Sequence, residues 1–541
     1  MPKLVFLTRH ISHRKVAGKL KKISNLHKVD TLIVGAGASG CLVAAKSAGA
    51  GKNVLILEAG PERKLEDLFS SQIWARKLKW GGAHVEEEGN LKIGHAFNSG
   101  YGTGGSALHH FAVWPRLHAN DFKVRDTYGV GLDWPFEYAE LQPYYDRIQK
   151  EVGISGDASQ ETWRPPGAPY PMPALPVFPQ GKIIAKGFSG RGMQTAPIPL
   201  AINSVPGNQR PACLFDGWCD AGCPTGALAN PLVTYLPQAL KAGCDIRHNA
   251  TVTKILHNKP GTAVTGVEYV TPDGSVHQVL ADTVVLAAFA VQNARLLLAS
   301  RTDKFPDGLA NEYGLVGRYL MTHISTSVYG LFKEETSPHL GPTGGQLINQ
   351  DNYQNKQREN GGFGSWQWLI ANALKPNDLL GIVNTRPDIY GAGLHPFMTR
   401  AARHMGNMVN IGEDVAQFEN RISLSKSLDA YNMPLAHTVH NIGAEGDAMN
   451  MLAVEEGLDV FKAAGAMEAW QGPRFGMHLL GGTVMGSKPE NSVTDSYGRC
   501  HTLNNLYVVG PGVFPSSGAV NPTFTIHALA LRTIEHLLET G

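Results

Sequence analysis

The chain has 541 residues, of which 43% are hydrophobic and 17% are charged, so it can bury a large core and is too apolar to be disordered. Its formal net charge of +2 gives no global field that would attract nucleic acid. No apolar run reaches the roughly 18 residues of a transmembrane helix. At this length, two or more structural units are expected.

Residues 1–29 form a basic extension with eight Lys or Arg and no acidic residue. The segment lacks the continuous apolar region of a secretory signal. Its apolar residues could share one face of a helix among the basic side chains; they are Leu4, Leu7, Ile11, Leu20 and Ile23. Two interpretations stay open, a basic amphipathic helix on a membrane or partner and a solvated, frayed terminus.

Residues 30–60 predict a strand, a glycine turn, a helix and a second strand. Gly35, Gly37 and Gly40 have the G-x-G-x-x-G spacing. The first glycine allows a tight turn, the second lets the backbone approach a pyrophosphate, and the third lets the helix pack on the strand. Glu58 ends the second strand, where a carboxylate can accept hydrogen bonds from ribose hydroxyls. This combination predicts a dinucleotide site rather than a structural glycine turn.

The rest of the chain alternates irregular and periodic segments. A glycine-rich stretch at residues 97–122 contains Gly102, Gly104 and Gly105, where a turn would bring the backbone close to a ligand. Elsewhere the pattern predicts strands at residues 252–256, 264–270, 283–288 and 506–509, and helices at about 292–300, 446–464 and 523–539. Much of the region from 330 to 470 gives mixed signals.

Three of the six cysteines are close together in sequence. Cys213, Cys219 and Cys223 have the spacing C-x5-C-x3-C and are followed by Pro224. Thiolates are the usual ligands of iron–sulfur clusters, whereas zinc usually takes four ligands. The residues favour a cluster and leave zinc or free thiols open. The other cysteines, Cys41, Cys244 and Cys500, are interpreted as ordinary core or surface residues.

Several of these stretches together resemble the glucose-methanol-choline (GMC) family of flavoenzymes. They are GAGASG with Glu58, GTGGSALHH, HLLGGTVMG, and NNLYVVGPGVFPSSGAVNPTFTIHALALR. Within that family, the cysteine segment and DTYGVGLDWPFEYAELQPYYD are similar to the large subunits of bacterial FAD-dependent sugar dehydrogenases, of the glucose, fructose, gluconate and glucoside types.

The resemblance implies an α/β fold, with a Rossmann-like FAD-binding domain and an interleaved α+β substrate-binding domain. The FAD-binding domain would consist of residues 30–118, 228–325 and 474–541. The substrate-binding domain would consist of residues 119–227 and 326–473, with a cysteine-rich loop at 207–227.

The resemblance also implies the site residues. His478 would be the catalytic base, because a neutral imidazole with an ordinary pKa of about 6.5 suits that role. Asn521 would hold the substrate oxygen. His109, His110 and His527 are competitors for these roles and are interpreted as pocket or structural residues. For FAD, the implied set adds to the motif glycines and Glu58 the residues Ala38, Ser39, Gly102, Gly104, Gly105, Ser106, Val252, Gly510, Gly512, Pro522 and Thr523.

Three positions depart from the family pattern. Gly510 stands where many relatives have Asp, Phe289 where glycine is common, and His110 where Trp or Asn is usual. These departures concern the geometry of the flavin pocket and the identity of the substrate.

The function that the resemblance implies is oxidation of a hydroxyl of a sugar, glycoside or polyol by hydride transfer to FAD. Electrons would then pass through a [3Fe-4S] cluster on Cys213, Cys219 and Cys223 to a cytochrome or quinone. The implied partners are a small subunit and a cytochrome c acceptor, with peripheral membrane association and no nucleic acid. The implied location is the cytoplasmic or periplasmic face of a bacterial inner membrane, reached through partner subunits.

Two alternatives stay open at this point. One is an oxygen-using GMC oxidase whose cysteines have lost their role. The other is an NAD(P)-binding electron-transfer module, which would leave the segments around His478 and Asn521 without a role.

Overall fold

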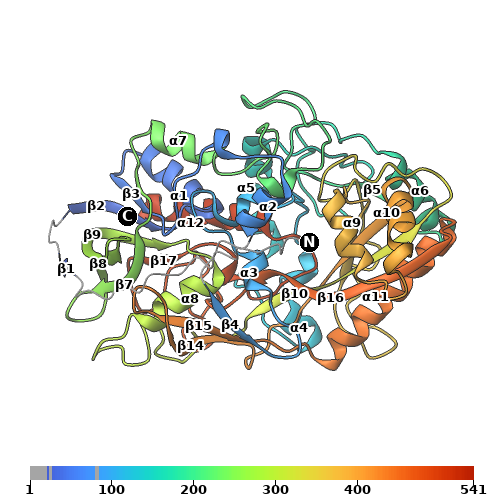
Figure 1. Ribbon diagram of the computed structural model, residues 1–541. Coiled ribbons are helices and arrows are strands. Elements are labelled where there is room, and N and C mark those ends of the chain that lie inside the picture. The colour runs from blue at the N-terminus through green and yellow to red at the C-terminus, as the bar shows by residue number, and fades with distance from the viewer. Residues whose placement is uncertain (1–20, 23–26, 80–83, 541) are drawn as a thin grey trace, which may run out of the picture.

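The computed structural model of the protein describes residues 21–22, 27–79 and 84–540. A mixed β-sheet on the left of Figure 1 and an antiparallel β-sheet on the right lie at opposite ends of the molecule, with helices packed on both. The fold is therefore of the α/β class, as expected. The apolar positions of the basic extension, Leu4, Leu7, Ile11, Leu20 and Ile23, all lie outside the described residues.

The mixed sheet has a parallel core. Its order is β6 (Asp245–Arg247), β3 (Val54–Leu57), β2 (His27–Val34), β9 (Ser275–Leu286), β8 (Val264–Val270) and β7 (Thr251–His257), and β1 (Lys21–Lys22) and β17 (Leu506–Val508) also pair with β9. β2 runs parallel to both β3 and β9, and Val34 is in register with Leu57 and Leu286. Three parallel strands thus end at one edge of the sheet, which is where open α/β sheets bind ligands.

Helices cover this sheet on both sides. α1 (Ala38–Gly49) follows β2 and packs against α12 (Thr523–Thr540) and α7 (Tyr235–Lys241), while α5 (Tyr138–Val152) packs on α12. α8 (Ala290–Ala299) follows β9 and packs against a small sheet of β14 (Arg421–Leu428), β15 (Pro434–Val439) and β4 (Val85–Glu88).

The second large sheet is antiparallel. Its order is β16 (Glu468–Leu480), β10 (Met321–Leu331), β13 (Met405–Gly412), β12 (Trp366–Ile370), β11 (Leu347–Asn349) and β5 (Ala196–Pro197). α11 (Ala444–Ala463) packs on β10, β13 and β16, and α6 (Pro179–Gly190) packs on α11. Further helices are α2 (Gln72–Lys79), α3 (His95–Asn98), α4 (Val124–Tyr128), α9 (Pro376–Val383) and α10 (Leu394–His404).

The element boundaries bear on the proposed domains. β10 and β16 pair along their whole lengths, so the predicted boundaries at 325/326 and 473/474 fall inside two paired strands. The division into domains stays a prediction. Within residues 21–22, 27–79 and 84–540, every helix is too short or too polar to cross a membrane.

Candidate active site

A cavity of about 1530 Å³ extends from the carboxyl edge of the mixed sheet to the end of β16. Ligand pockets typically measure about 300–1,000 Å³, so this one has room for a large cofactor and a second small ligand. Its walls come from segments far apart in the chain, within residues 34–39, 57–59, 98–113, 250–252, 287–296, 428–435, 477–479, 510–511 and 521–526, together with Lys79, His84, Leu369 and Val409.

The three motif glycines have three different surroundings. Gly35 has φ +106°, and a Cβ there would lie 2.7 Å from the carbonyl oxygen of Ala287. A Cβ on Gly40 would lie 2.1 Å from the carbonyl oxygen of Gly35. A Cβ on Gly37 would meet no protein atom within 4 Å, and Gly37 lines the cavity. These surroundings correspond to the tight turn, the helix packing and the open approach that the spacing predicts.

Glu58 joins the two glycine-rich segments at the cavity wall. Its carboxylate accepts hydrogen bonds from the backbone N–H of Ala36 at 2.8 Å, of Gly60 at 2.8 Å and of Gly102 at 3.1 Å. A carboxylate has about four acceptor positions, so about one is left for a ribose hydroxyl. The sequence predicts the ribose role and does not reveal this structural one.

The remaining predicted cofactor residues divide into two groups. Those that line the cavity are Ala38, Ser39, Gly102, Gly105, Ser106, Val252, Gly510, Pro522 and Thr523. Gly40, Gly104 and Gly512 lie behind its wall. A Cβ on Gly104 would lie 2.6 Å from the Leu108 side chain, and one on Gly512 would lie 2.6 Å from Oγ1 of Thr483. These glycines shape the wall.

The cavity fits an anionic dinucleotide. α1 begins after Gly37 and presents its free N–H groups to the cavity, where a helix N-terminus favours a pyrophosphate. Several buried polar atoms of the wall have no hydrogen-bond partner among the described residues, namely Nε2 of His109, Nε2 of His110 and Nε2 of Gln292. Buried polar atoms without partners are costly, so a polar ligand that contacts them would be stabilised.

His478 and Asn521 meet at the other end of the cavity, with Nε2 of His478 3.3 Å from Nδ2 of Asn521. His478 lies on β16 where the register with β10 slips: His323 pairs with Met477 and Thr322 pairs with Leu479. His478 is thus the extra residue of a β-bulge and has φ +62°. Bulges re-aim side chains, and strained residues of this kind cluster at functional sites.

The environment of His478 favours the neutral form of its ring. Burial lowers the pKa of His478 well below its usual 6.5, and the neighbouring His323 lowers it further. Burial also lowers the pKa of His323 to about 4. A neutral His478 has a free lone pair and can accept a proton.

The competing histidines have other environments. His109 and His110 also line the cavity, and burial lowers their pKa values to about 3 and about 4. His527 does not line it. Its Nδ1 lies 2.7 Å from the carbonyl oxygen of Thr523, and its ring lies 4.6 Å from that of Trp114. His527 is therefore a packing residue of α12.

Phe289 and Gly510, two of the positions that depart from the family pattern, have positive φ and line the cavity. Phe289 has φ +74° and ψ 161°, a conformation that is almost exclusive to glycine. Gly510 has φ +102°. Phe289 therefore places an aromatic side chain on the cavity wall at the start of α8, where a glycine would have none. This side chain reduces the space that is available to a bound ligand.

His323 is a site residue that the sequence reasoning missed. It is fully buried, and its Nδ1 lies 2.9 Å from Nδ1 of His478. The only sign of His323 in the sequence is its position at the end of the apolar segment of residues 314–323. The register between β10 and β16 brings the two rings together, and that register cannot be seen in the sequence.

The three clustered cysteines lie in a loop beside the cavity. The sulfur of each accepts a backbone N–H, from Phe215 at 3.3 Å for Cys213, from Thr343 at 3.4 Å for Cys219 and from Leu228 at 3.3 Å for Cys223.

The cysteine loop does not form a site for a single ion. Within the described residues, groups of three or more His, Cys, Asp or Glu arranged to hold one metal ion are absent. Burial, followed by the charge of Cys223, raises the pKa of Cys213 to about 11. Asp220 forms an ion pair with Lys79 at 2.7 Å, and Lys79 lines the cavity, so the loop and the cavity share a wall.

Comparison with known proteins identifies the family to which the chain belongs. The GMC oxidoreductase models match residues 29–325 and 417–530. The fructose dehydrogenase large subunit of Gluconobacter japonicus is 29% identical over 94% of this chain and 97% of its own. The 2-methyl-1,2-propanediol dehydrogenase of Mycolicibacterium austroafricanum is 30% identical over 94% of this chain and 95% of its own.

A solved structure shows the same fold. The formate oxidase of Aspergillus oryzae RIB40 superimposes with a TM-score of 0.68 at 16% identity and covers 95% of this chain and 98% of its own. The match to the GMC oxidoreductase family models sets aside the alternative of an NAD(P)-binding electron-transfer module. The chain belongs to the GMC oxidoreductase family and is an FAD-dependent oxidoreductase that acts on CH–OH groups.

Proposed function

We propose that this enzyme is a dehydrogenase that oxidises a hydroxyl of a sugar, glycoside or related polyol. The observation that carries the proposal is the meeting of His478 Nε2 and Asn521 Nδ2 in a cavity whose other end is the dinucleotide motif. The names of the two relatives, a fructose dehydrogenase and a propanediol dehydrogenase, support a polyhydroxylated substrate.

The residues that would hold FAD follow from the cavity wall. The N–H groups at the start of α1 and the open side of Gly37 would hold the pyrophosphate, and the free lone pair of Glu58 would accept a ribose hydroxyl. Gly102, Gly105 and Thr523 would contact the rest of the cofactor. When bound, FAD supplies the acceptor for the hydride.

The protein side chains handle the hydroxyl. Nε2 of His478 takes the proton when the substrate O–H bond breaks, and an N–H bond forms in its place. Nδ2 of Asn521 donates a hydrogen bond to the substrate oxygen and stabilises its developing negative charge. FAD would supply the acceptor for the electron pair of the C–H bond, and loss of that pair would leave a C=O bond in the product.

We also propose that Cys213, Cys219 and Cys223 hold a [3Fe-4S] cluster. The three sulfur atoms, each accepting a backbone N–H, support this, because hydrogen bonds to sulfur are one of the means by which proteins tune such clusters. Cys213, Cys219 and Cys223 would be the thiolate ligands of the cluster, which contains several irons and so differs from a site for a single ion. It would supply one-electron chemistry beside the cavity. A cytochrome or quinone acceptor and a small subunit are the corresponding partners.

The experiment is a panel of sugars, glycosides and polyols added to the purified holoenzyme without oxygen, with flavin absorbance as the readout. Bleaching by a member of the panel supports the reaction, and no bleaching by any member contradicts it. Repeating the active case with oxygen or a dye as the acceptor separates the dehydrogenase from the oxygen-using oxidase.

Iron analysis of protein purified without oxygen tests the cluster, which predicts several irons per chain. An iron content near zero would contradict the proposal of a cluster.

A further inference from the structure

His323 stands behind the catalytic pair and does not reach the cavity. Its ring is held by two carbonyl groups: Nε2 lies 3.2 Å from the oxygen of Ser517 and 3.0 Å from the oxygen of Gly518. Because a carbonyl oxygen only accepts hydrogen bonds, Nε2 of His323 carries the hydrogen. A neutral imidazole has a single N–H, so Nδ1 of His323 carries a lone pair.

This arrangement decides the tautomer of the neighbouring ring. Nδ1 of His323 faces Nδ1 of His478 at 2.9 Å. Since the His323 atom is the acceptor, the hydrogen between the two rings belongs to His478. His478 therefore has its hydrogen on Nδ1, and its lone pair is on Nε2, the atom that faces Asn521.

A chain of buried amides approaches the same atom from the other side. Nε2 of Gln350 lies 2.8 Å from Oε1 of Gln367, and Nε2 of Gln367 lies 3.0 Å from Oδ1 of Asn521. The chain ends at Nδ2 of Asn521, which faces Nε2 of His478. Each amide donates at one end and accepts at the other, so the chain by itself could run in either direction.

The carbonyl groups at His323 select one direction. In the reverse direction, Asn521 would present its oxygen, and Nε2 of His478 would need the hydrogen. Lone pairs of His478 and His323 would then face each other across 2.9 Å. Only the direction in which Asn521 presents its NH₂ group leaves every pair with one donor and one acceptor.

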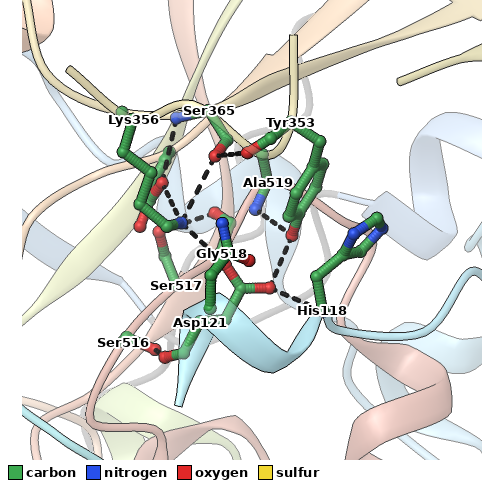
Figure 2. A network of polar contacts seen from close by, with 12 residues as sticks. His118, Asp121, Tyr353, Lys356, Ser365, Ser516, Ser517, Gly518 and Ala519 are labelled. Atoms are coloured by element: carbon green, nitrogen blue, oxygen red, sulfur yellow. Dashed lines mark hydrogen bonds and ion pairs between the residues drawn. The ribbon is translucent and has the colours of Figure 1, made fainter. Parts of the chain in front are cut away.

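The segment that carries the two carbonyl groups is itself held by a buried network (Figure 2). The carboxylate of Asp121 accepts hydrogen bonds from Nζ of Lys356 at 2.7 Å and from the hydroxyl of Tyr353 at 2.8 Å. The backbone N–H of Ala519 donates to the same hydroxyl at 2.9 Å, and Oγ of Ser516 donates to the carbonyl of Asp121 at 2.7 Å. The segment is thus fixed on both sides of Ser517 and Gly518.

We propose that His323 is a positioning residue that holds His478 in the tautomer whose Nε2 accepts the substrate proton and, through it, directs the NH₂ group of Asn521 at the substrate oxygen. This inference rests on the proposed function in that the substrate is an alcohol. When His478 gains the proton at Nε2, its Nδ1–H keeps the same acceptor, so no ring or amide has to turn during the reaction.

The kinetic test compares two substitutions at His323 by anaerobic flavin reduction with an active substrate. His323→Leu removes the acceptor, whereas Oδ1 of Asn in His323→Asn can accept from Nδ1 of His478. We expect His323→Leu to slow flavin reduction roughly 10-fold to 100-fold, part of the rate that a general base supplies, and His323→Asn to recover most of it. His257→Leu is the matched control, because both ring nitrogens of His257 are hydrogen-bonded but the residue lies on β7 outside the cavity wall.

Flavin content and Tm are recorded for each variant. An unchanged rate in His323→Leu, or equal losses in both variants with full flavin content, would overturn the proposal. If His323→Leu does not fold, neutron diffraction from deuterated wild-type holoenzyme decides: deuterium on Nδ1 of His478 and Nε2 of His323 supports the proposal, and deuterium on Nε2 of His478 overturns it. If no alcohol reduces the wild-type flavin, the proposed function fails while the neutron map still tests the tautomer.

Discussion

The dinucleotide region, residues 30–60, and the region around the proposed base His478, called the catalytic region below, have opposite structural requirements. The first must remove side chains so that backbone can approach a cofactor, and it places glycine where φ is positive, as at Gly35 with φ +106°. The second must present side chains, and it places a histidine at φ +62°. The first is one contiguous stretch, whereas His478 contacts residues 155 and 43 positions away. A glycine turn that receives a cofactor can be specified by a short stretch of sequence, whereas the pairing of His478 with Asn521 depends on tertiary structure.

The strain of the catalytic region extends along the cavity wall. Ala112, Phe289 and His478 all have positive φ without being glycine, and all three line the cavity. Each such residue costs about 1–3 kcal/mol and persists only where the surrounding structure holds it. In the dinucleotide motif, glycine avoids this cost. The catalytic region therefore depends more on its surroundings than the dinucleotide region does.

The largest expected effect is in the dinucleotide region. Gly37→Leu should abolish FAD binding and give colourless protein, because the new side chain would occupy the open space beside Gly37 in the cavity. Absorbance of the purified protein measures this. Gly49→Leu at the other end of α1 is the matched control, since a Cβ there also meets no atom within 4 Å but Gly49 is outside the cavity wall. Full flavin content in Gly37→Leu would show that the pyrophosphate lies elsewhere.

The next effect separates chemistry from cofactor binding. His478→Ala should lower turnover by a factor on the order of 10² to 10⁴ while FAD stays bound, because the proton acceptor is lost. Anaerobic flavin reduction and flavin content measure the two properties separately. Near-normal turnover would transfer the role of base to His109 or His110, which line the same cavity.

A smaller loss is expected at the partner of His478. Asn521→Ala should lower turnover by a factor on the order of 10 to 10³, because it removes one hydrogen bond to the substrate oxygen and leaves the base in place. Comparing kcat with kcat/KM shows whether the bond acts in the transition state. A change in KM alone would mean that Asn521 only binds the substrate.

The contrast between the regions also explains what the sequence could predict. The strand that was predicted to end at Glu58 is found at Val54–Leu57, and the glycine turn is found as expected, because local spacing determines both. The locations of His478 and Asn521 came from a resemblance to a family and not from residue patterns. His323 was missed because its role depends on the slipped register between β10 and β16.

The structural role of Glu58, which accepts three backbone N–H groups, was missed for a similar reason. Its three backbone donors come from residues 22, 2 and 44 positions away, and only the first glycine motif was expected to lie near it. The sequence could indicate the chemistry of a carboxylate at the end of a strand. It could not show that the second glycine segment folds back onto that carboxylate.

The smallest expected effect is a dependence of stability on pH that differs between the regions. Burial lowers the pKa values of His323 and His118 to about 4 and that of His478 well below 6.5, whereas residues 30–60 contain no histidine. Below pH 6.5, the unfolded chain binds protons at these histidines that the folded protein does not, so their contribution to stability is complete above pH 6.5 and is lost as the pH falls toward about 4.

Two buried groups have the opposite effect on the pH dependence of stability. The pKa of Glu161 is raised to about 7 by burial, and that of His440 is raised by Asp414 despite its burial, so both favour the folded state at lower pH. We expect the histidines with lowered pKa values to outweigh them, so that Tm falls between pH 7.5 and pH 5. Amide hydrogen exchange should show protection lost in β10 and β16 before β2 and α1, because the titrating rings of His323 and His478 lie on the first pair. If β2 and α1 lost protection first, the acid-sensitive part would be the dinucleotide region, and the proposed contrast in dependence on surroundings would be wrong.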